Sequence, residues 1–95
     1  QDVEVIVFRI VQELLNNVVR HAAATQVIVQ CIRDGARVHL TVEDNGKGMD
    51  AATPDRAHGV GWMNIRSRVN FLEGSLDLHT APGKGTSVNI EFQLK

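Results

Sequence analysis

The feature that most restricts the fold of this chain is a segment near its start, residues 3–23. It contains neither glycine nor proline and repeats apolar residues at helical spacing. Apolar residues that recur every three or four positions line up on one side of a helix. The segment therefore predicts one long helix whose apolar side must be covered by the rest of the chain. The residues of this stripe are Val7, Val11, Leu14, Leu15, Val18 and Ala22.

From residue 26 the pattern changes to that of strands. Residues 26–33 are rich in β-branched side chains, and in residues 37–43 apolar side chains alternate with polar ones. Between the two segments stand Asp34 and Gly35, a pair typical of tight turns. We therefore expect a β-hairpin with a short turn.

The next part of the chain predicts a loop and a second helix. Residues 49–58 have no usable period and contain small residues, charges and Pro54, which indicates a mobile loop. Residues 61–72 fit a helix, because Gly74 stands just beyond their end and apolar residues recur along one face. The residues of that face are Ile65, Val69 and Leu72.

Two more strands complete the expected fold. Leu76 and Leu78 mark a third strand, the turn 81–85 follows, and residues 88–94 alternate again between apolar and polar. The order helix, strand, strand, helix, strand, strand predicts an α+β protein of two layers, with helices packed on one face of a mostly antiparallel sheet.

Length and charge limit the classes of protein that remain. A chain of 95 residues can bury one modest core, so we expect a single domain. The net charge of -1 conceals no long run of one sign, so neither a nucleic acid nor a membrane surface is indicated as a partner. The chain has no stretch long enough to span a membrane, and it starts without Met or a basic leader. We expect a fragment cut from a longer chain.

The single cysteine, Cys31, excludes a disulfide within the chain. A lone cysteine fits a reducing compartment, so we expect a cytoplasmic domain with Cys31 as a small buried side chain. The four histidines lie far apart in the sequence, and Cys31 has no partner thiol. A zinc site is therefore not expected.

Residues 42–50, VEDNGKGMD, allow two interpretations. Asn45-Gly46 is typical of a hairpin turn. No returning strand follows Gly48, however, which favours a strand end that leads into a flexible lid. A carboxylate fixed there, Asp44, can accept a hydrogen bond from an amino group such as that of adenine. Glycine at positions 46 and 48 would let a ring lie against the backbone.

A second pair of glycines, Gly59 and Gly61, stands just before the second predicted helix. Free N–H groups and the positive end of the dipole at a helix start favour an anion, so this pair could bind phosphate. The alternative is that the two glycines belong to an ordinary turn and bind no ligand. Neither a Rossmann fingerprint nor a P-loop is present, because the residues that follow the glycines do not fit those motifs.

The first helix carries polar residues along one side. Glu13, Asn17 and Arg20 are spaced so that all three project together, with His21 beside Arg20. The alternative is a solvated helix face. Asn16 and Asn17 weigh against that alternative, because asparagines in a helix reduce its stability without capping it. Oxygen ligands of this kind suit Mg²⁺, which completes its shell with water and nucleotide phosphates.

Taken in order, these motifs resemble the ATP-binding domain of the family that includes histidine kinases, DNA gyrase B, Hsp90 and MutL. RIVQELLNNVVRHA looks like the N box of that family, and DNGKG, HGVGWMNIRSRV and GKGTS look like its three glycine boxes. The resemblance covers nearly the whole chain. Within the family, RIVQELLNN and SRVNFLEGSLDLHTAPGKGTSV are most similar to sensor histidine kinases of the NarX and DesK type.

The resemblance implies the Bergerat fold, with a mixed sheet that is mostly antiparallel, and ATP and Mg²⁺ as cofactors. It makes Asn17 the metal ligand and Glu13 the acid beside the metal and the phosphates. It implies that Asp44 binds the amino group of adenine, beneath a lid formed by residues 49–58. The other nucleotide-binding residues that it implies are Arg20, His21, Gly46, Gly48, Gly59, Gly61 and Thr86.

The resemblance also implies partners. A histidine kinase transfers the γ-phosphoryl group to a histidine on a separate dimerisation domain and then serves a response regulator, usually as a homodimer that is either membrane-anchored or free. We therefore expect this chain to bind Mg-ATP and to turn it over barely when alone. Two other functions stay open at this point: an anti-sigma serine kinase of the same fold, and an interaction module that has lost ATP binding.

Overall fold

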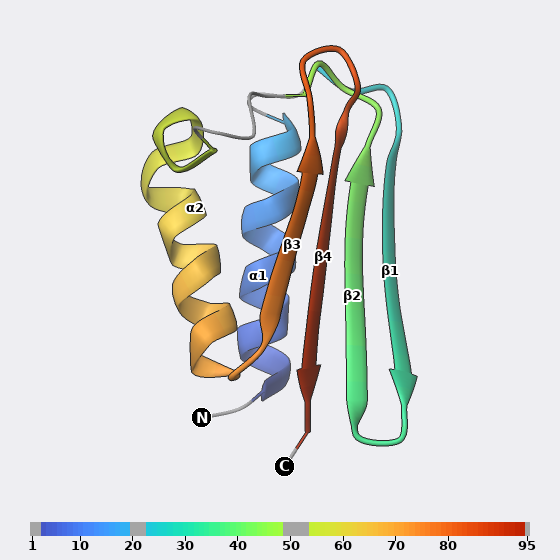
Figure 1. Ribbon diagram of the computed structural model, residues 1–95, viewed down its shortest axis with the longest axis vertical. Helices are drawn as coiled ribbons and strands as arrows, with labels where there is room; N and C mark the ends of the chain where they lie inside the picture. The colour runs from blue at the N-terminus through green and yellow to red at the C-terminus, as the bar shows by residue number, and fades with distance from the viewer. Residues whose placement is uncertain (1–2, 20–22, 49–53, 95) are drawn as a thin grey trace.

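The computed structural model of the chain describes residues 3–19, 23–48 and 54–94, with the backbone alone for residues 54–61. Helices and strands follow the predicted order. They are α1 (Val3–Asn17), β1 (Val27–Asp34), β2 (Arg37–Asp44), α2 (Pro54–Phe71), β3 (Ser75–Thr80) and β4 (Thr86–Gln93). Figure 1 shows the two helices next to each other on one side of the strands.

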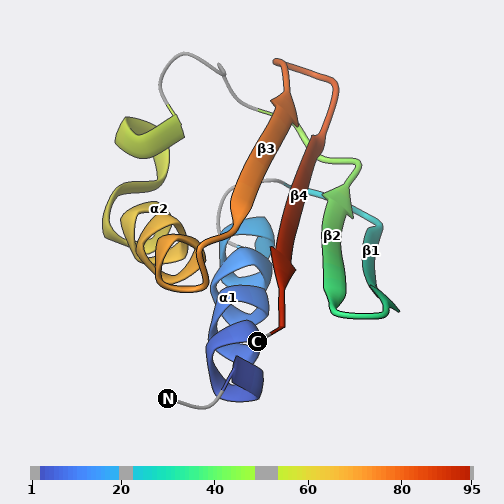
Figure 2. The ribbon, with the colours of Figure 1, turned by 60° about the horizontal axis from the view of Figure 1, so that its bottom comes forward.

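The four strands form one sheet in the order β1-β2-β4-β3. Each pair of neighbouring strands is antiparallel. Both helices lie against the same face of the sheet (Figure 1, Figure 2). The predicted α+β class and the two-layer arrangement are therefore confirmed. The expected mixed character is not seen, because the strands that the structure describes include no parallel pair.

The first two strands form the predicted hairpin, with its turn one residue later than expected. Asp34 still belongs to β1 and pairs with Arg37, so Gly35 and Ala36 make the turn. Gly35 has a φ of 63°, which suits the first central position of a two-residue hairpin turn. The hairpin therefore depends on glycine at this position for its backbone conformation.

The buried side of α1 is rotated from the predicted stripe. Ile6, Ile10 and Leu14 face the core, whereas Val7 and Val11 pack only partly against its margin. Isoleucine buries more apolar area than valine, so this rotation stabilises the helix more. The helix also ends earlier than predicted: its regular part stops at Asn17. Asparagine has a low helix propensity, which fits an end at this position.

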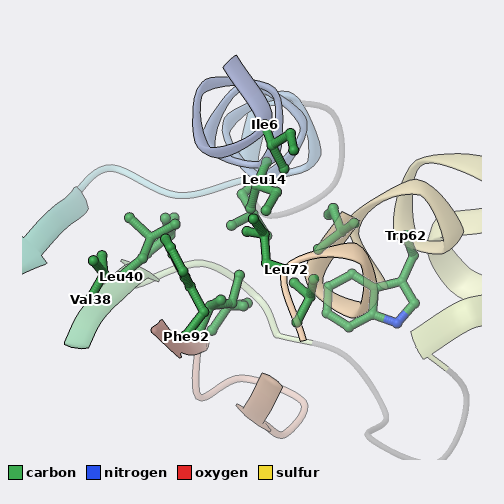
Figure 3. Packing of buried hydrophobic residues seen from close by; sticks show 13 residues of the cluster. Ile6, Leu14, Val38, Leu40, Trp62, Leu72 and Phe92 are labelled. Carbon is green, nitrogen blue, oxygen red and sulfur yellow. The ribbon is translucent and has the colours of Figure 1, made fainter. Parts of the chain in front are cut away.

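Alternate residues of β2 and β4 face the helices, as their apolar pattern predicted. Figure 3 shows Ile6 and Leu14 of α1 turned toward Leu72, the residue directly after α2, with Leu40 and Phe92 of the sheet beside them. Complete burial of one large apolar side chain stabilises a protein by about 1.5–3 kcal/mol. The sheet, α2 and the residue directly after α2 supply most of the buried residues: Val38, Leu40, Val42, Trp62, Ile65, Val69, Leu72, Val88, Ile90 and Phe92.

The second helix begins well before the predicted start. We expected a loop over residues 49–58 and a helix from residue 61, but α2 starts at Pro54. Proline suits the first position of a helix, because it has no N–H and its φ is already helical. The pattern gave no sign of this start, because residues 54–60 include few apolar side chains. Residues 49–53 lie outside the described part of the chain.

The end of α2 differs in detail from the predicted glycine cap. Glu73, not Gly74, takes the left-handed conformation, with a φ of 56°. The N–H of Gly74 donates to the Val69 carbonyl and closes the last turn. A Cβ on Gly74 would lie 2.7 Å from the carbonyl oxygen of Glu91. Glycine is therefore required at this position by the close approach of β4.

The prediction that Cys31 is buried is wrong, because Cys31 is exposed. It lies on β1, an edge strand whose residues are all exposed. In the sheet register Cys31 stands opposite Leu40, so it belongs to the face that carries the helices. The two helices lie beside β2, β4 and β3 and do not reach this edge (Figure 2).

Candidate functional site

Most of the predicted site residues that the structure describes gather at one end of the molecule. The end of α1, the end of β2 and the turn between β3 and β4 all lie at this end (Figure 1). They bring together Asn17, Asp44 and Thr86, which are far apart in the sequence. Arg20 and His21 lie outside the described residues, so their predicted roles remain predictions.

Asp44 is the last residue of β2, and its carboxylate is held in a fixed orientation. The side chain is partly buried, and its Oδ1 accepts the N–H of Gly46 at 2.8 Å. Within the described part of the chain, the other oxygen, Oδ2, has no hydrogen-bond partner. A carboxylate oriented by one oxygen keeps the second for a donor such as an amino group. Such an arrangement is suited to a ligand that donates one hydrogen bond at the end of the strand.

Thr86 is the direct neighbour of Asp44 across the sheet. The two residues are paired in the register of β2 and β4. The Thr86 hydroxyl lies 2.9 Å from that of Thr80, and the Thr80 hydroxyl also donates to the Gly85 carbonyl. These contacts fix the side of the site next to the carboxylate.

Two glycines allow the loops at this end to interlock: the predicted site residue Gly48, and Gly85 of the third glycine box. A Cβ on Gly48 would lie 2.0 Å from the carbonyl oxygen of Ala81, and one on Gly85 would lie 2.3 Å from that of Asp44. The N–H of Gly83 also donates to the Lys47 carbonyl. Glycine at positions 48 and 85 is therefore needed for the packing of one loop on the other, whatever contact either makes with a ligand. Gly46 is buried in the same place.

Asn17 is the only buried polar side chain among the described residues, with 8% of its surface exposed. It closes the regular part of α1 and makes no side-chain hydrogen bond within the described part of the chain. A buried amide normally has a partner, so Asn17 is a candidate for a group that is held for a ligand. Glu13 lies one turn earlier on the helix and is partly buried.

The oxygens of Asn17 and Glu13 fit Mg²⁺ in type. Magnesium usually takes only one or two protein ligands and keeps several waters or phosphate oxygens. The described residues contain no cluster of three or more His, Cys, Asp or Glu side chains that could enclose a metal. A metal at this position would therefore depend on a ligand such as a nucleotide to complete its shell.

Gly59 and Gly61 do not stand before the second helix, as the sequence predicted. Both lie within α2, which starts at Pro54. The physical reason given for them, free N–H groups at a helix start, therefore does not apply in this structure. Figure 2 shows the beginning of α2 set at an angle to the rest of the helix. Contact of these glycines with phosphate stays a prediction.

One residue of the site was missed by the sequence interpretation. The side-chain oxygen of Asn45 accepts the N–H groups of Thr25 and Gln26 at 2.9 and 3.0 Å, and its amide donates to the Thr25 hydroxyl. The backbone N–H of Asn45 also donates to Gln26. Asn45 thus ties the end of β2 to the segment that arrives from α1. Its position after a strand and before glycine suggested only a turn.

A cavity of about 710 Å³ borders the same strand ends, and residues from both faces of the sheet line it. Asp44, Thr80 and Thr86 contribute to its wall, together with side chains that point away from the helices, such as Glu43 and His79. Because Asp44 and Thr86 belong to the helix side of the register, we assign the site to the part of this cavity on that side.

The family of the chain follows from sequence comparison. A family model described as histidine kinase-, DNA gyrase B- and HSP90-like ATPase matches residues 2–95. The chain belongs to this family. The predicted family is therefore confirmed, while the NarX and DesK type within it stays a prediction.

Relatives of this ATPase-family chain include two bacterial histidine kinases. It is 35% identical over 94 residues to the signal transduction histidine-protein kinase/phosphatase DegS of Brevibacillus brevis, and it covers 24% of that relative. It is also 35% identical over 94 residues to the sensor histidine kinase ComP of Bacillus subtilis, of which it covers 12%. The matches span 99% and 98% of this chain. The chain thus spans a quarter or less of these curated relatives.

Solved structures show the same fold. The histidine kinase domain of the blue-light activated histidine kinase EL346 from Erythrobacter litoralis has a TM-score of 0.80 at 27% identity, over 94% of this chain and 43% of that one. The Acinetobacter baumannii histidine kinase AdeS has a TM-score of 0.78 over 95% of this chain and 46% of that one. At 17% identity, the second likeness shows the fold alone. Among the described helices, neither is long and apolar enough to cross a membrane.

Proposed function

We propose that this chain is the ATP-binding catalytic domain of a sensor histidine kinase and that it forms part of a longer protein. It binds Mg-ATP at the end of the sheet and presents the γ-phosphate in line to a histidine on the dimerisation domain of the same parent kinase. The parent kinase acts as a homodimer and serves a response regulator. The contribution of this domain is to position the phosphate and to neutralise its charge.

The observation that carries the proposal is the fixed carboxylate of Asp44. One oxygen accepts the N–H of Gly46, and the other has no partner among the described residues and is open to a donor. The amino group of adenine is such a donor. The glycines of the interlocked loops beside it have no side chain in the way, so the flat adenine ring can lie against their backbone. Thr86, directly across the sheet, would assist from the other side.

The phosphate end of the nucleotide would lie toward the end of α1. Asn17 and Glu13 offer oxygens on the same side of that helix, and Arg20 and His21 follow in the sequence. Asn17 would be a ligand of Mg²⁺, with Glu13 beside the metal and the phosphates. When bound, the metal would neutralise negative charge on the phosphate oxygens. Gly59 and Gly61 would contact the phosphates from the other side.

Transfer to histidine, as opposed to a protein serine, is favoured by the relatives. DegS and ComP, each 35% identical to this chain over nearly its whole length, are histidine kinases by name. In this proposal the domain works in the cytoplasm and contacts neither a nucleic acid nor a membrane directly. Alone, it should bind nucleotide and barely turn it over.

Calorimetric titration with ATP and ADP, with and without Mg²⁺, tests the proposal. We expect both nucleotides to bind, and ATP to bind more tightly in the presence of Mg²⁺. Asn17→Ala should abolish the Mg²⁺ dependence, whereas Asn16→Ala, which alters an exposed neighbour, should keep it. If neither ATP nor ADP binds, the catalytic role is excluded. If Asn17→Ala retains the full Mg²⁺ effect, the metal assignment is wrong.

A further inference from the structure

The outer surface of the helical layer contains a groove between α1 and α2, away from the candidate nucleotide site. The groove encloses about 480 Å³ and is lined by residues from both helices. It lies along the first half of α1 and the last part of α2, at the opposite end of the molecule from Asp44 (Figure 1). The lining residues are Ile6, Arg9, Asn64, Ser67, Arg68 and Phe71.

The described lining of the groove has one sign of charge. Among the residues that the structure describes, only Arg9 from α1 and Arg68 from α2 are charged and line it. Neither forms an ion pair or a side-chain hydrogen bond within the described part of the chain. The other arginines whose side chains the structure describes each have a contact: Arg33 with the Gly35 carbonyl, Arg37 with Glu91 and Arg66 with the Trp62 ring. The two uncompensated arginines therefore meet at a single place.

The groove also offers apolar surface. Phe71, the last residue of α2, keeps 64% of its surface exposed at the edge of the groove, and Ile6, with 5% exposed, lies at its floor. Val5 is exposed as well and precedes Arg9 by one helical turn. An exposed aromatic beside uncompensated arginines is typical of a protein-binding surface, where aromatic residues and arginine are enriched.

We propose that this groove binds an acidic amphipathic helix of a partner protein. Leucine-like side chains of the helix would fill the space over Ile6 and against Phe71, and its carboxylates would pair with Arg9 and Arg68. Arginine forms two parallel hydrogen bonds to a carboxylate, so the two cations also fix the orientation of the bound helix. A concave groove with a recessed floor favours an inserted helix over a flat lipid surface. The proposal goes beyond nucleotide binding and does not depend on it.

The test uses the chain with a synthetic peptide of about 14 residues, or four helical turns. The peptide carries leucine along one side of the helix and glutamate on both flanks, and a scrambled peptide of the same composition lacks the apolar side. Fluorescence anisotropy measures the affinity, and amide chemical shifts locate the bound peptide. We expect shifts at Ile6, Arg9, Asn64 and Arg68 but not at Asp44, together with weaker binding at high salt.

Substitutions then assign the interaction to the groove. Arg9→Ala and Arg68→Ala should each weaken binding about tenfold, the effect of losing one charge-assisted contact of about 1.4 kcal/mol. Phe71→Ala should weaken it by a similar factor. Arg33→Ala, which removes an exposed arginine from the hairpin turn, is the matched control and should leave the affinity unchanged. Circular dichroism of each variant checks that the fold is intact.

Several results would overturn the proposal. Absence of binding excludes the groove as an acceptor of acidic helices. Equal binding of the scrambled peptide, or an equal loss with Arg33→Ala, shows that general charge attraction is responsible. Tighter binding to phosphatidylglycerol vesicles than to the peptide, with shifts at the same residues, assigns the groove to a membrane instead. The ability to bind ATP, measured in the same samples, is expected to remain unchanged by all four substitutions.

Discussion

The two ends of the sheet use the same left-handed glycine conformation for different purposes. Gly35, in the hairpin turn at one end, has a φ of 63° and no atom within 4 Å of the place where a Cβ would stand. Gly48, at the other end, has a φ of 68°, but a carbonyl oxygen lies 2.0 Å from that place. The first glycine is needed for its backbone conformation alone. The second is needed also because there is no room for a side chain.

The turn between β3 and β4 repeats this difference within two residues. Gly83 and Gly85 have φ values of 78° and 75°, yet only at Gly85 would a Cβ meet the other loop, at the carbonyl of Asp44. The φ values are nearly the same within each pair, so a comparison of the two variants of a pair emphasises the contacts at the Cβ position. The remaining difference in the free energy of unfolding measures the contribution of the interlocked loops that hold Asp44.

The largest effect is expected for Gly48→Ala. Alanine at a left-handed position costs about 1–2 kcal/mol, and the overlap with Ala81 adds a displacement of the whole loop. We expect a loss of about 4 kcal/mol in the free energy of unfolding, measured by urea denaturation. Gly35→Ala should cost only the strain, about 1–2 kcal/mol. Equal losses in the two variants would show that the ends of the sheet do not differ.

A somewhat smaller effect is expected for Gly85→Ala. Its overlap with the Asp44 carbonyl is less severe, so we expect a loss of about 3 kcal/mol against about 1–2 kcal/mol for Gly83→Ala. The displaced loop should also weaken nucleotide binding, because it no longer positions the Asp44 carboxylate. If Gly85→Ala binds ATP as well as Gly83→Ala does, the interlocking does not position the carboxylate.

Asn45→Ala should have the smallest effect of the three on stability. It removes three hydrogen bonds at an exposed position, for which we expect a loss of about 2 kcal/mol. Arg33→Ala removes the hydrogen bond from Arg33 to the Gly35 carbonyl at the far turn and should cost about 0.5 kcal/mol. Asn45→Asp keeps the acceptor oxygen, so it should recover most of the stability and of the ATP affinity. Failure of Asn45→Asp to recover either would contradict the role of that oxygen as a tie to the segment before β1.

Much of the fold could be predicted from the sequence, because the strands are short and alternate clearly. Val38, Leu40 and Val42 alternate with polar residues and face the helices as expected. The start of α2 could not be predicted, since residues 54–60 carry too few apolar side chains to show a period. The exposure of Cys31 depends on which strand lies at the edge, and alternation within a strand does not reveal the order of strands in the sheet.

The site could be predicted only in part. Asp44 and Asn17 stood out because a carboxylate at a strand end and an asparagine within a helix need a reason beyond local structure. The tie made by Asn45 joins residues 19 and 20 positions apart, and the glycine loops meet across a still longer separation. Such contacts are fixed by the packing of the whole sheet, so a local motif indicates the residues but not what they touch.

The central claim is that the interlocked end of the sheet holds Asp44 to bind adenine. Asp44→Asn replaces the free acceptor with a donor at nearly constant shape, and Asp34→Asn makes the same change at the far turn. Titration of both variants with Mg-ATP and with Mg-tripolyphosphate separates adenine binding from phosphate binding. We expect Asp44→Asn alone to weaken ATP binding strongly, with tripolyphosphate unaffected. An equal loss for both ligands, or an equal ATP affinity in the two variants, would contradict the claim.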